Sequence, residues 1–554
     1  MANFVELEKN IKEIIDDLQG LCSTNGLSNT AGEEIVVTSV FLYKFLNDKF
    51  IANLNDFCKK NNFKFEDVIA DEDYMDAFYD SYPQDVAFKY EDTIDYLVNN
   101  KYNDDDFYDQ FDKTLERISA YDINMEFSVE TAGGEKKPLF TALSPYVEAS
   151  KRNAFVRNIF SYITRDRFDF GQTVDGNYDF FSTIFEYLIS NYNVASGTYA
   201  EYFTPQALSK AIGQILVHMA PVEDKIYEVY DPSAGSGSLV LHLANELGNG
   251  KFGNKARVYT QDISQKSSRF LRINMLLNGL KESLENIIEG DTLETPSHFK
   301  IKGDDTSGLK RFDFITSNPP FKTDFSSTRD AIETKWNKTN RFFAGVPSVP
   351  NKKKDSMAIY LCFIQHILYS LKESGKAAIV VPTGFLSAKS GIENSLRKLI
   401  IDKKWLRGVV SMPSNIFANT GTNVSVLFID KSSTNENIYI LDASELGTKI
   451  KVGKNSKTVL SDEELNYIVN CFLNHTIIEK KSVLVEYSQI VSKKYSLTAG
   501  SYFDVKMEYE KLTIEEFNSK IKSLKEKIQE DHFESNRLYE EIIEAMENIK
   551  YENN

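Results

Sequence analysis

The chain has 554 residues, of which 42% are hydrophobic and 26% are charged, and its net charge at pH 7 is −17. This length predicts about two to four domains, because one hydrophobic core stops growing at roughly 250–300 residues. The acidic balance argues against a protein that grips DNA by itself, since such proteins present a strongly basic surface. If the chain acts on nucleic acid, we expect a partner to supply much of the binding.

The sequence shows no sign of a membrane segment or of a metal site. No stretch reaches the run of about 18 apolar residues that a membrane helix needs, and the start MANFVELEKNIKEIIDD lacks the apolar core of a signal peptide. The four cysteines are scattered without a CxxC pair, which argues against a disulfide framework or a zinc site. They fit a reducing compartment, so we expect a cytoplasmic protein without bound metal and without membrane contact.

The N-terminal third has a helical pattern. Residues 1–52 are predicted to be helical, because Ile11, Ile14, Ile15 and Leu18 recur at helical spacing, as do apolar residues in IVVTSVFLYKFL. Residues 71–120 are acidic and aromatic, which favours helices with solvated acids over a buried stripe of Tyr and Phe. A DNA-mimicking or partner-docking surface is the alternative interpretation of this block. Segment 154–193 again looks helical.

Between residues 201 and 219 the sequence EYFTPQALSKAIGQILVHM predicts a helix that begins at its ThrPro pair. Thr204 can cap the helix and Pro205 suits its first position. A plain helix start explains these two residues on its own. The aromatic and polar groups before the helix can also close over a bound ligand, and the residues predicted to do so are Glu201, Tyr202, Phe203, Thr204, Pro205 and Gln206.

From residue 225 to residue 442 the pattern changes to short β-rich runs that alternate with helical windows. Such alternation predicts βαβ units and an α/β fold with a mostly parallel sheet. Two of these runs, RGVVSMP and NVSVLFID, are joined by a short loop, so we expect them to pair antiparallel at one edge of the sheet. The runs are KIYEVYD, ARVYTQD, NIIEGD, FDFITS, AAIVVP, RGVVSMP, NVSVLFID and NIYILD.

The stretch 230-YDPSAGSGSLV-240 is typical of a ligand site at the end of a strand. Asp231 ends the strand, and Gly235 and Gly237 let the backbone approach a ligand before the next helix. A glycine turn needed only for packing is the alternative. The next two strands end with Asp262 and Asp291, so three acids share one edge of the sheet. Acids repel phosphate but suit the hydroxyl groups of a ribose, which predicts a cationic nucleoside, S-adenosylmethionine, as cofactor.

The stretch 312-FDFITSNPPF-321 ends a strand with an amide, two prolines and an aromatic ring. Asn318 falls at the same edge as Asp231 if FDFITS is the fourth strand. Pro319 and Pro320 fix the turn and remove N–H groups, which leaves the Asn318 side-chain oxygen and the Pro319 carbonyl as acceptors. Two acceptors aimed at one point suit a planar NH₂ group, and Phe321 offers a face for a flipped base. A strand-ending turn with a core phenylalanine is the alternative interpretation.

The C-terminus is predicted to form a long helix. Thr513 and Glu516 have the spacing of a capping box. Apolar residues follow at three- and four-residue steps, as in a helix that packs on another helix. An intramolecular partner and another subunit are both open as the surface that this helix covers.

These motifs, in the order YFTP, DPSAGSG, QD, GD and SNPPF, resemble the γ arrangement of the amino-methyltransferases that use S-adenosylmethionine. The stretches RFFAGVPSVPNKKKDSMAIYLCFIQHIL, AAIVVPTGFLS and MPSNIFANTGTNVSVLFIDK further resemble the modification (methylation) subunit of type I restriction–modification systems. The resemblance covers about 1–52 and 155–440. It implies N6-adenine methylation of DNA by direct transfer to a flipped adenine. It also implies that the chain forms a complex with a separate specificity subunit, usually two methylating subunits to one specificity subunit. A restriction subunit can join this complex.

The resemblance also implies a fold, a division into domains and a set of site residues. The fold is a Rossmann-like methyltransferase sheet of seven strands, mostly parallel, with an antiparallel edge hairpin. The domains are a helical N-terminal domain at 1–170 with an acidic insert, a methyltransferase domain at 171–480, and a helical tail at 481–554 that docks a specificity subunit. With the acids and glycines above, the cofactor residues include Ser233, Ala234, Ile263 and Thr292, and the adenine residues are Asn318, Pro319, Pro320 and Phe321.

The chain departs from the family pattern in several places. Asp262 stands where the family commonly has Glu, Phe203 where it often has Tyr, and the acidic block 55–150 matches no part of the family. Two rival functions are a methyltransferase that acts on glutamine of a protein and a cofactor-binding scaffold without its own activity. The tail TGTNVSVLFIDK argues against the first and an intact Asn318 against the second. The DNA target sequence cannot be read from this chain.

Overall fold

The computed structural model describes residues 2–547 except 29, 84, 132–133, 135, 166–168, 172–183, 185–186, 188–203, 220, 249–254, 337–338, 418–422, 453–454 and 504–511. Residues 1–502 form one compact unit and residues 503–554 form a second, and the two are described separately. The expected domain boundaries at 170 and 480 stay predictions.

The N-terminal part of the first unit is helical, as its periodicity predicts. The apolar residues Ile11, Ile14, Ile15 and Leu18 are all buried, on one face of the first helix. In the acidic block the acids are mostly exposed while phenylalanines such as Phe78 are buried, which confirms the interpretation as a helical surface over an aromatic core. The helices are α1 (Ala2–Thr24), α2 (Ala31–Asn61), α3 (Phe65–Ala70), α4 (Glu72–Ser81), α5 (Ile94–Asn100), α6 (Phe107–Ala120) and α7 (Arg152–Ile163).

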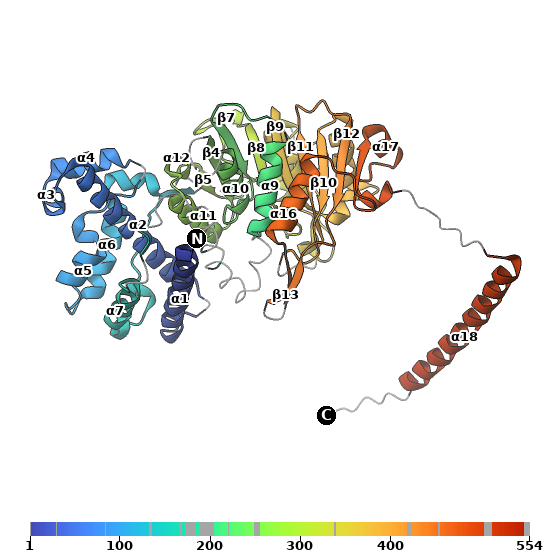
Figure 1. Ribbon diagram of the computed structural model, residues 1–554, viewed down its shortest axis with the longest axis horizontal. Coiled ribbons are helices and arrows are strands. Elements are labelled where there is room, and N and C mark those ends of the chain that lie inside the picture. Colours follow the sequence, from blue (N-terminus) through green and yellow to red (C-terminus); the bar gives the residue numbers. More distant parts are fainter. Residues whose placement is uncertain are drawn as a thin grey trace. The chain divides into compact units, whose positions relative to one another are not determined.

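A large mixed sheet forms the centre of the first unit, and most of its neighbouring strands are parallel (Figure 1). Its strands run in the order β15 (Ser482–Glu486), β12 (Asn437–Asp442), β10 (Leu406–Ser411), β11 (Val424–Asp430), β9 (Leu371–Pro382), β8 (Phe312–Ser317), β3 (Tyr227–Asp231), β4 (Ala256–Asp262), β5 (Ile287–Glu289), β1 (Val129–Thr131) and β2 (Lys136–Lys137).

All of the β-rich runs in the sequence form strands of this sheet, which confirms the α/β fold class. The sheet has 11 strands rather than the seven expected, because β12 and β15 extend one edge and β1 and β2 the other. β1 and β2 have 3 and 2 residues, too few for a recognisable alternation. The antiparallel pairing of β10 with β11 is confirmed, but its expected place at the edge is wrong, since β12 and β15 lie outside β10.

Helices cover both faces of the sheet. On one face α9, α10 and α16 pack side by side (Figure 1), and α11 packs against β4 and β5. Right-handed crossovers place α14, which joins β8 to β9, and α15, which follows β9, on the opposite face. These helices are α9 (Gln206–His218), α10 (Ser238–Leu247), α11 (Gln265–Leu277), α12 (Lys281–Leu284), α14 (Tyr360–Ser370), α15 (Gly391–Asp402), α16 (Asp462–Leu473) and α17 (Tyr487–Ser492).

Three excursions leave the sheet. The hairpin β6 (Phe299–Ile301) and β7 (Asp304–Leu309) precedes β8, and the hairpin β13 (Thr448–Val452) and β14 (Asn455–Val459) follows β12. Between β8 and α14 the chain makes a longer excursion that contains α13 (Arg329–Trp336). A small hydrophobic core separate from the main one supports this excursion, and it includes Phe325, Ile332, Val346 and Met357.

The second unit contains one long helix, α18 (Ile514–Glu547). The predicted capping box is present, since the backbone N–H of Thr513 donates to the Glu516 carboxylate at 2.8 Å and the Glu516 N–H donates to the Thr513 hydroxyl at 3.3 Å. None of the residues of α18 is buried. Within the described residues, no helix combines the length and the apolar character that crossing a membrane requires.

Candidate functional site

The predicted site motifs follow the carboxyl ends of neighbouring parallel strands. β3 pairs with β8 so that Tyr230 faces Ile315, and it pairs with β4 so that Asp231 faces Thr260. Asn318 follows β8 directly and therefore lies at the same edge of the sheet as the turn after Asp231. The structure thus brings together the two motifs that the sequence places almost 90 residues apart.

The turn after β3 depends on its two glycines. Gly235 and Gly237 have φ angles of 52° and 84°, in the left-handed region that favours glycine. A Cβ atom at Gly237 would lie 2.2 Å from Cδ1 of Leu271 on α11, so a larger residue would displace that side chain. The backbone N–H of Gly235 donates to Oδ2 of Asp262 at 2.9 Å, which ties the turn to the end of β4.

Two carboxylates beside this turn have no cationic partner in the described part of the chain. Asp231 is 1% exposed and accepts a hydrogen bond from the Ser233 N–H at 3.0 Å. Burial raises the pKa of Asp231 well above its ordinary value, and the charge of Asp262 adds to this increase. Burial also raises the pKa of Asp262, although the N–H groups of Ser264 and Gly235 oppose it. Because no lysine, arginine or histidine of the described residues offsets either charge, a cation bound here would stabilise both carboxylates.

Asn318 is held in a defined orientation by contacts on both sides. Its side chain is 8% exposed, and its Nδ2 donates to the Thr204 hydroxyl at 3.1 Å. The preceding residue, Ser317, is buried, and its hydroxyl lies 2.7 Å from the hydroxyl of Ser233 in the glycine turn. Since Nδ2 is directed to Thr204, the side-chain oxygen of Asn318 is the atom left to accept from a substrate.

The aromatic ring of the motif lies in a group of rings beside the asparagine. Phe321 is half-buried and makes an edge-to-face contact with Tyr360 at 6.3 Å between ring centroids, and Tyr360 makes the same contact with Phe385 at 6.2 Å. Pro319 is buried and Pro320 is half-buried. Phe321 therefore belongs partly to the core, as the alternative interpretation expects, and it keeps exposed ring surface for stacking.

The turn after β5 is fixed by its own hydrogen bonds. Oδ1 of Asp291 accepts from the N–H groups of Leu293 and Glu294 at 2.8 and 3.2 Å. The hydroxyl of Thr292 donates to the Pro232 carbonyl at 2.7 Å, which joins this turn to the turn after β3. Both predicted residues thus lie at the expected edge, and the structure gives Thr292 a structural contact that the sequence did not indicate.

Sequence reasoning gave no role to Arg341, which braces the turn after β5 from below. Its guanidinium is fully buried and donates to the carbonyls of Thr292 and Leu293 at 2.7 and 2.8 Å. Its Nε donates to Nδ1 of His366 at 3.0 Å, and Nε2 of His366 lies 3.2 Å from the Tyr230 hydroxyl. Burial lowers the pKa of Arg341 to about 9. The only signal in the sequence is an arginine in the apolar run RFFAGV, which does not reveal its partners.

The remaining predicted residues divide into two groups. Ala234 is buried, Ile263 is 73% exposed at the same edge, and Gln206 has a buried Nε2 atom without a partner within the described chain. Thr204 and Pro205 are buried at the start of α9. The other predicted residues, Glu201, Tyr202 and Phe203, lie outside the described residues.

The residues present fit S-adenosylmethionine. Two carboxylates without a cation suit a molecule that carries a sulfonium and an ammonium group. The exposed side chain of Ile263, directly after Asp262, offers an apolar surface to a purine. The positive-φ glycine turn permits close backbone approach, and the unpartnered amide of Gln206 can donate to a carboxylate. In the described residues, no group of three or more His, Cys, Asp or Glu side chains is arranged to hold a metal ion.

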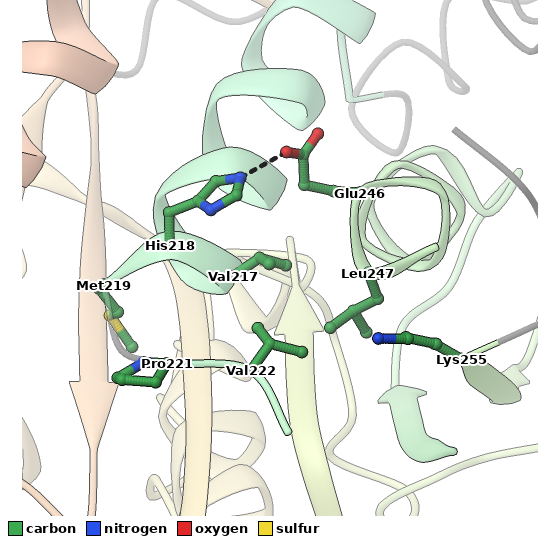
Figure 2. Close-up of a pocket in the computed structure, with 8 residues that line it drawn as sticks. All are labelled: Val217, His218, Met219, Pro221, Val222, Glu246, Leu247 and Lys255. Atoms are coloured by element: carbon green, nitrogen blue, oxygen red, sulfur yellow. Dashed lines mark hydrogen bonds and ion pairs between the residues drawn. The ribbon is translucent and has the colours of Figure 1, made fainter. Parts of the chain in front are cut away.

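A cavity of about 570 Å³ lies at the opposite end of the sheet. Figure 2 shows His218 at the end of α9 directed at Glu246 on α10, with 2.6 Å between Nε2 and Oε1. Val222 and Lys255, which also line the cavity, precede the amino ends of β3 and β4. Ligands of open α/β sheets bind at the carboxyl ends, so this cavity is not the candidate site.

Comparison with known proteins agrees with this geometry. The family model described as N-6 DNA Methylase matches residues 176–511, which is more than half of the chain. The methylase subunit of the type I restriction enzyme MpnII of Mycoplasma pneumoniae is 28% identical, over 99% of this chain and 98% of that protein.

Two solved structures have similar folds. The methyltransferase subunit of a type I restriction–modification system from Streptococcus thermophilus has a TM-score of 0.67 at 21% identity, and the match covers 90% of this chain and 99% of that one. A chain from a structure of type I restriction–modification complex assembly has a TM-score of 0.53 at 14% identity, over 97% of this chain and 99% of that one. Both show the fold, and Asn318 lies in it at the edge where such sheets bind ligands.

Proposed function

The chain belongs to the N-6 DNA methylase family, and we propose that it works as the methylating subunit of a type I restriction–modification complex. It is a DNA adenine N6-methyltransferase that uses S-adenosylmethionine. The observation that carries the role of the site is the position of Asn318, beside the glycine turn and oriented by Thr204. With DNA as substrate, the proposed place of action is the cytoplasm.

S-adenosylmethionine, when bound, supplies a methyl group on a good leaving group, so the chain needs no strong base. Asp231, Asp262 and Asp291 and the turn Ser233–Gly235 are proposed to hold the cofactor, with Ile263 against its adenine. Gln206 and the segment before it are proposed to close over its methionine part. These residues exclude water and fix the position of the methyl group relative to Asn318.

The asparagine and the first proline are proposed to hold the amino group of the target adenine. The Asn318 side-chain oxygen and the Pro319 carbonyl each accept a hydrogen bond from one N6–H group. These hydrogen bonds return electron density to the nitrogen as it becomes tetrahedral. With S-adenosylmethionine held by Asp231, Asp262 and the glycine turn, its sulfonium would supply the methyl group to N6, S-adenosylhomocysteine would leave, and N6 would lose one proton to solvent. Thr204 positions Asn318, because a rotated amide would present donors instead of an acceptor.

The target adenine is proposed to stack on Phe321 after it leaves the duplex. An adenine inside a duplex cannot reach the turn after β8, so the nucleotide must rotate out of the stack. Tyr360 contacts the Phe321 ring in an edge-to-face arrangement. A preformed aromatic surface lowers the ordering cost of the flipped base.

The proposed partners follow from the same assignment. They are double-stranded DNA, a specificity subunit, a second copy of the methylating subunit and a restriction subunit. The exposed apolar stripe of α18 supports docking of the specificity subunit, since it leaves 49–80% of each side chain accessible at Ile514, Phe517, Ile521, Leu524 and Ile528. A net charge of −17 supports a partner that supplies DNA affinity.

A labelling experiment tests the proposal. The purified chain, alone and with its co-expressed specificity subunit, is incubated with methyl-tritiated S-adenosylmethionine and plasmid DNA. We expect label in DNA, recovered as N6-methyladenine after digestion, and a large increase when the specificity subunit is present. Label found only in protein would contradict DNA methylation and favour a protein methyltransferase. Tight sequence-specific DNA binding by the chain alone at physiological salt would contradict the role of the partner.

A further inference from the structure

The excursion between β8 and α14 carries an unusual charge for this chain. From Lys322 to Asp355 the sequence has eight Lys and Arg residues and four Asp and Glu residues, in a protein with a net charge of −17. Four exposed lysines at the two ends of this segment form no ion pair within the described residues, and we call them the lysine ledge: Lys322, Lys352, Lys353 and Lys354. The segment therefore carries a net positive charge within an acidic chain.

The lysine ledge lies directly beside the proposed adenine site. Lys322 follows Phe321, and the N–H of the next residue, Thr323, donates to the Met357 carbonyl at 3.1 Å. This hydrogen bond joins the two segments of the excursion that carry the ledge lysines, one at its start and one near its end. The Ser326 N–H donates to Oδ1 of Asp324 at 2.9 Å, and hydrogen bonds from Ser326, with a smaller contribution from the charge of Lys354, lower the pKa of Asp324.

Backbone hydrogen bonds hold the turn that carries three of the lysines. Lys353 has a φ angle of 58°, in the left-handed region, and the N–H groups of Ser356 and Met357 donate to the carbonyls of Lys353 and Lys354 at 2.9 and 3.2 Å. Met357 is buried in the small hydrophobic core of the excursion, beside Phe325. The lysine backbones are thus fixed relative to the asparagine turn, while their side chains reach solvent.

Arg341 anchors the same excursion to the cofactor edge of the sheet. It donates to the carbonyls of Thr292 and Leu293, and Leu293 itself belongs to the small core of the excursion. The excursion is therefore held at two places, on the turn after β5 and on the turn after β8. A surface that is anchored at two places stays at a constant distance from the reacting atoms, which is what positioning a substrate requires.

We propose that the lysine ledge binds the phosphates of the DNA strand that carries the target adenine, next to the flipped nucleotide. This inference rests on the proposed function and adds the surface that holds the backbone. Lysine ammonium groups contact phosphates as point charges and do not read base edges, so the ledge contributes no sequence preference. A flipped nucleotide turns about its backbone, and fixed flanking phosphates give that rotation a defined end point.

The ledge also accounts for DNA handling by an acidic chain. Asp324 and Asp355 are the acids nearest in sequence to the ledge, and they offset only part of its charge. The specificity subunit supplies long-range affinity in the proposed complex. The ledge supplies a short-range contact at the one place where the backbone must be held, so the overall charge of the chain can stay negative.

The test compares two variants with the same change in net charge. The ledge variant removes four charges beside the adenine site, and the control removes four charges from the β6–β7 hairpin and from the turn between α15 and β10. In the control, Lys404 matches Lys353, because its φ angle is 56° and it is exposed. The substitutions are Lys322→Gln, Lys352→Gln, Lys353→Gln and Lys354→Gln in the ledge variant, and Lys300→Gln, Lys302→Gln, Lys403→Gln and Lys404→Gln in the control.

Each variant is purified with the specificity subunit, and binding to a fluorescein-labelled 30-base-pair duplex is measured between about 50 and 200 mM NaCl. Each phosphate contact contributes about 0.9 to the slope of log affinity against log salt, so we expect the ledge variant to lower the slope by about 3 to 4. The control should change it by less than about 1. We also expect a higher KM for DNA in the ledge variant and unchanged S-adenosylmethionine affinity in both.

Equal slopes and equal KM values for the ledge variant and the control would overturn the proposal. The wild-type complex separates this result from a failure of the proposed function. If the wild type methylates adenine in the plasmid while the ledge variant keeps its slope, the function stands and the ledge does not. If the wild type labels only protein, the DNA-methylating function fails and the ledge fails with it.

Discussion

At the amino ends of β3 and β8 the acids are bound by lysines, whereas at the carboxyl ends of β3 and β4 they face no cation among the residues that the structure describes. Glu228 lies 2.6 Å from the ammonium of Lys310 and 3.0 Å from that of Lys372, and Lys372 also lies 2.9 Å from Asp313. Burial acts against ionisation of Glu228, but hydrogen bonds from the two lysines give a net decrease of its pKa. At the other end burial raises the pKa of Asp231.

The difference teaches where this sheet performs chemistry. A carboxylate with lysine partners has its charge balanced and has little to gain from a ligand. A buried carboxylate without a partner gains free energy when a cation arrives, because the cation offsets the cost of its burial. Two buried acids without a cation beside a glycine turn therefore indicate the position of the ligand site better than the large cavity at the amino ends does.

The largest effect is expected at the carboxyl end of β8. Asn318→Ala removes the side-chain acceptor for N6, and we expect methylation to fall by a factor of about 100 to 1,000 or more, as when a donor or acceptor of a preorganised polar site is removed. Cofactor affinity should stay within about threefold, since Asn318 faces the substrate. The measurement is tritium transfer to DNA together with calorimetric titration of S-adenosylmethionine.

Asp313→Asn, at the amino end of the same strand, is the matched control for Asn318→Ala. Asp313 is 8% exposed and is bound by Lys372, so the variant changes a buried polar group on β8 without touching the edge that holds the site. We expect it to keep full methylation at a reduced unfolding temperature. Normal methylation by Asn318→Ala would refute the role of its amide, and loss of activity in both variants would show only that β8 must be intact.

The sequence predicts this comparison only in part. The order of the β-rich runs and the glycines shows that Asp231 and Asn318 share an edge, because carboxyl ends of parallel strands meet there. The lysine partners of Glu228 could not be predicted, since Lys310 precedes β8 and Lys372 lies in β9, both far along the chain. The hydrogen bond from Asn318 to Thr204 joins residues 114 apart, and no local pattern encodes it.

The outer strands and the brace under the site were missed for a related reason. β1 and β2 have only 3 and 2 residues, and β15 is an edge strand in which burial is incomplete, so the alternation of apolar residues is weak in all three. Arg341 donates to backbone carbonyls, and any residue type supplies such an acceptor, so its target leaves no mark in the sequence. Patterns of side chains predict which strands form, whereas contacts to the backbone emerge only from the fold.

A second test exchanges charge for a neutral amide at each end of the sheet. Asp262→Asn should weaken S-adenosylmethionine binding by about 10- to 150-fold, because a hydrogen bond to a charged group contributes about 1.5–3 kcal/mol. Glu228→Gln should leave the cofactor affinity unchanged and lower the free energy of unfolding by about 1 kcal/mol, since two lysines lose a charged partner. Titration calorimetry and urea unfolding measure both quantities.

The comparison would break if the two variants exchanged their effects. A cofactor affinity that depends on Glu228 would place the binding edge at the amino ends, near the cavity lined by His218 and Lys255. A loss of stability in Asp262→Asn larger than its loss of binding would mean that Asp262 serves mainly to tie the glycine turn through Gly235. The first outcome contradicts the site, and the second reduces Asp262 to a structural residue.

The smallest effect concerns the brace below the carboxyl ends and depends on pH. Burial, and then the charge of Arg341, lowers the pKa of His366 well below its ordinary value of 6.5. Since the unfolded chain takes up this proton first, the stability that His366 contributes is present above pH 6.5 and is lost as pH falls below it. One such group gives a slope of at most about 1.4 kcal/mol per pH unit. His366→Asn keeps an acceptor for Nε of Arg341 but does not titrate, so its free energy of unfolding should fall less between pH 7 and pH 5.5.

The difference between wild type and His366→Asn isolates this one group. The raised pKa of Asp231 makes a contribution of opposite sign, since stability from that group is lost as pH rises through its folded-state pKa, but both proteins contain it. Urea unfolding at pH 7 and pH 5.5 gives the two free-energy changes. Parallel changes would mean that His366 is already protonated in the folded state. A protonated imidazole has no free acceptor, so its Nδ1 could not accept the hydrogen bond from Nε of Arg341. A smaller change in the free energy of unfolding of the variant would show that His366 is a neutral buried imidazole. The edge with the two unbalanced acids would then be supported by a neutral group, whereas the acids at the other end are bound by lysines.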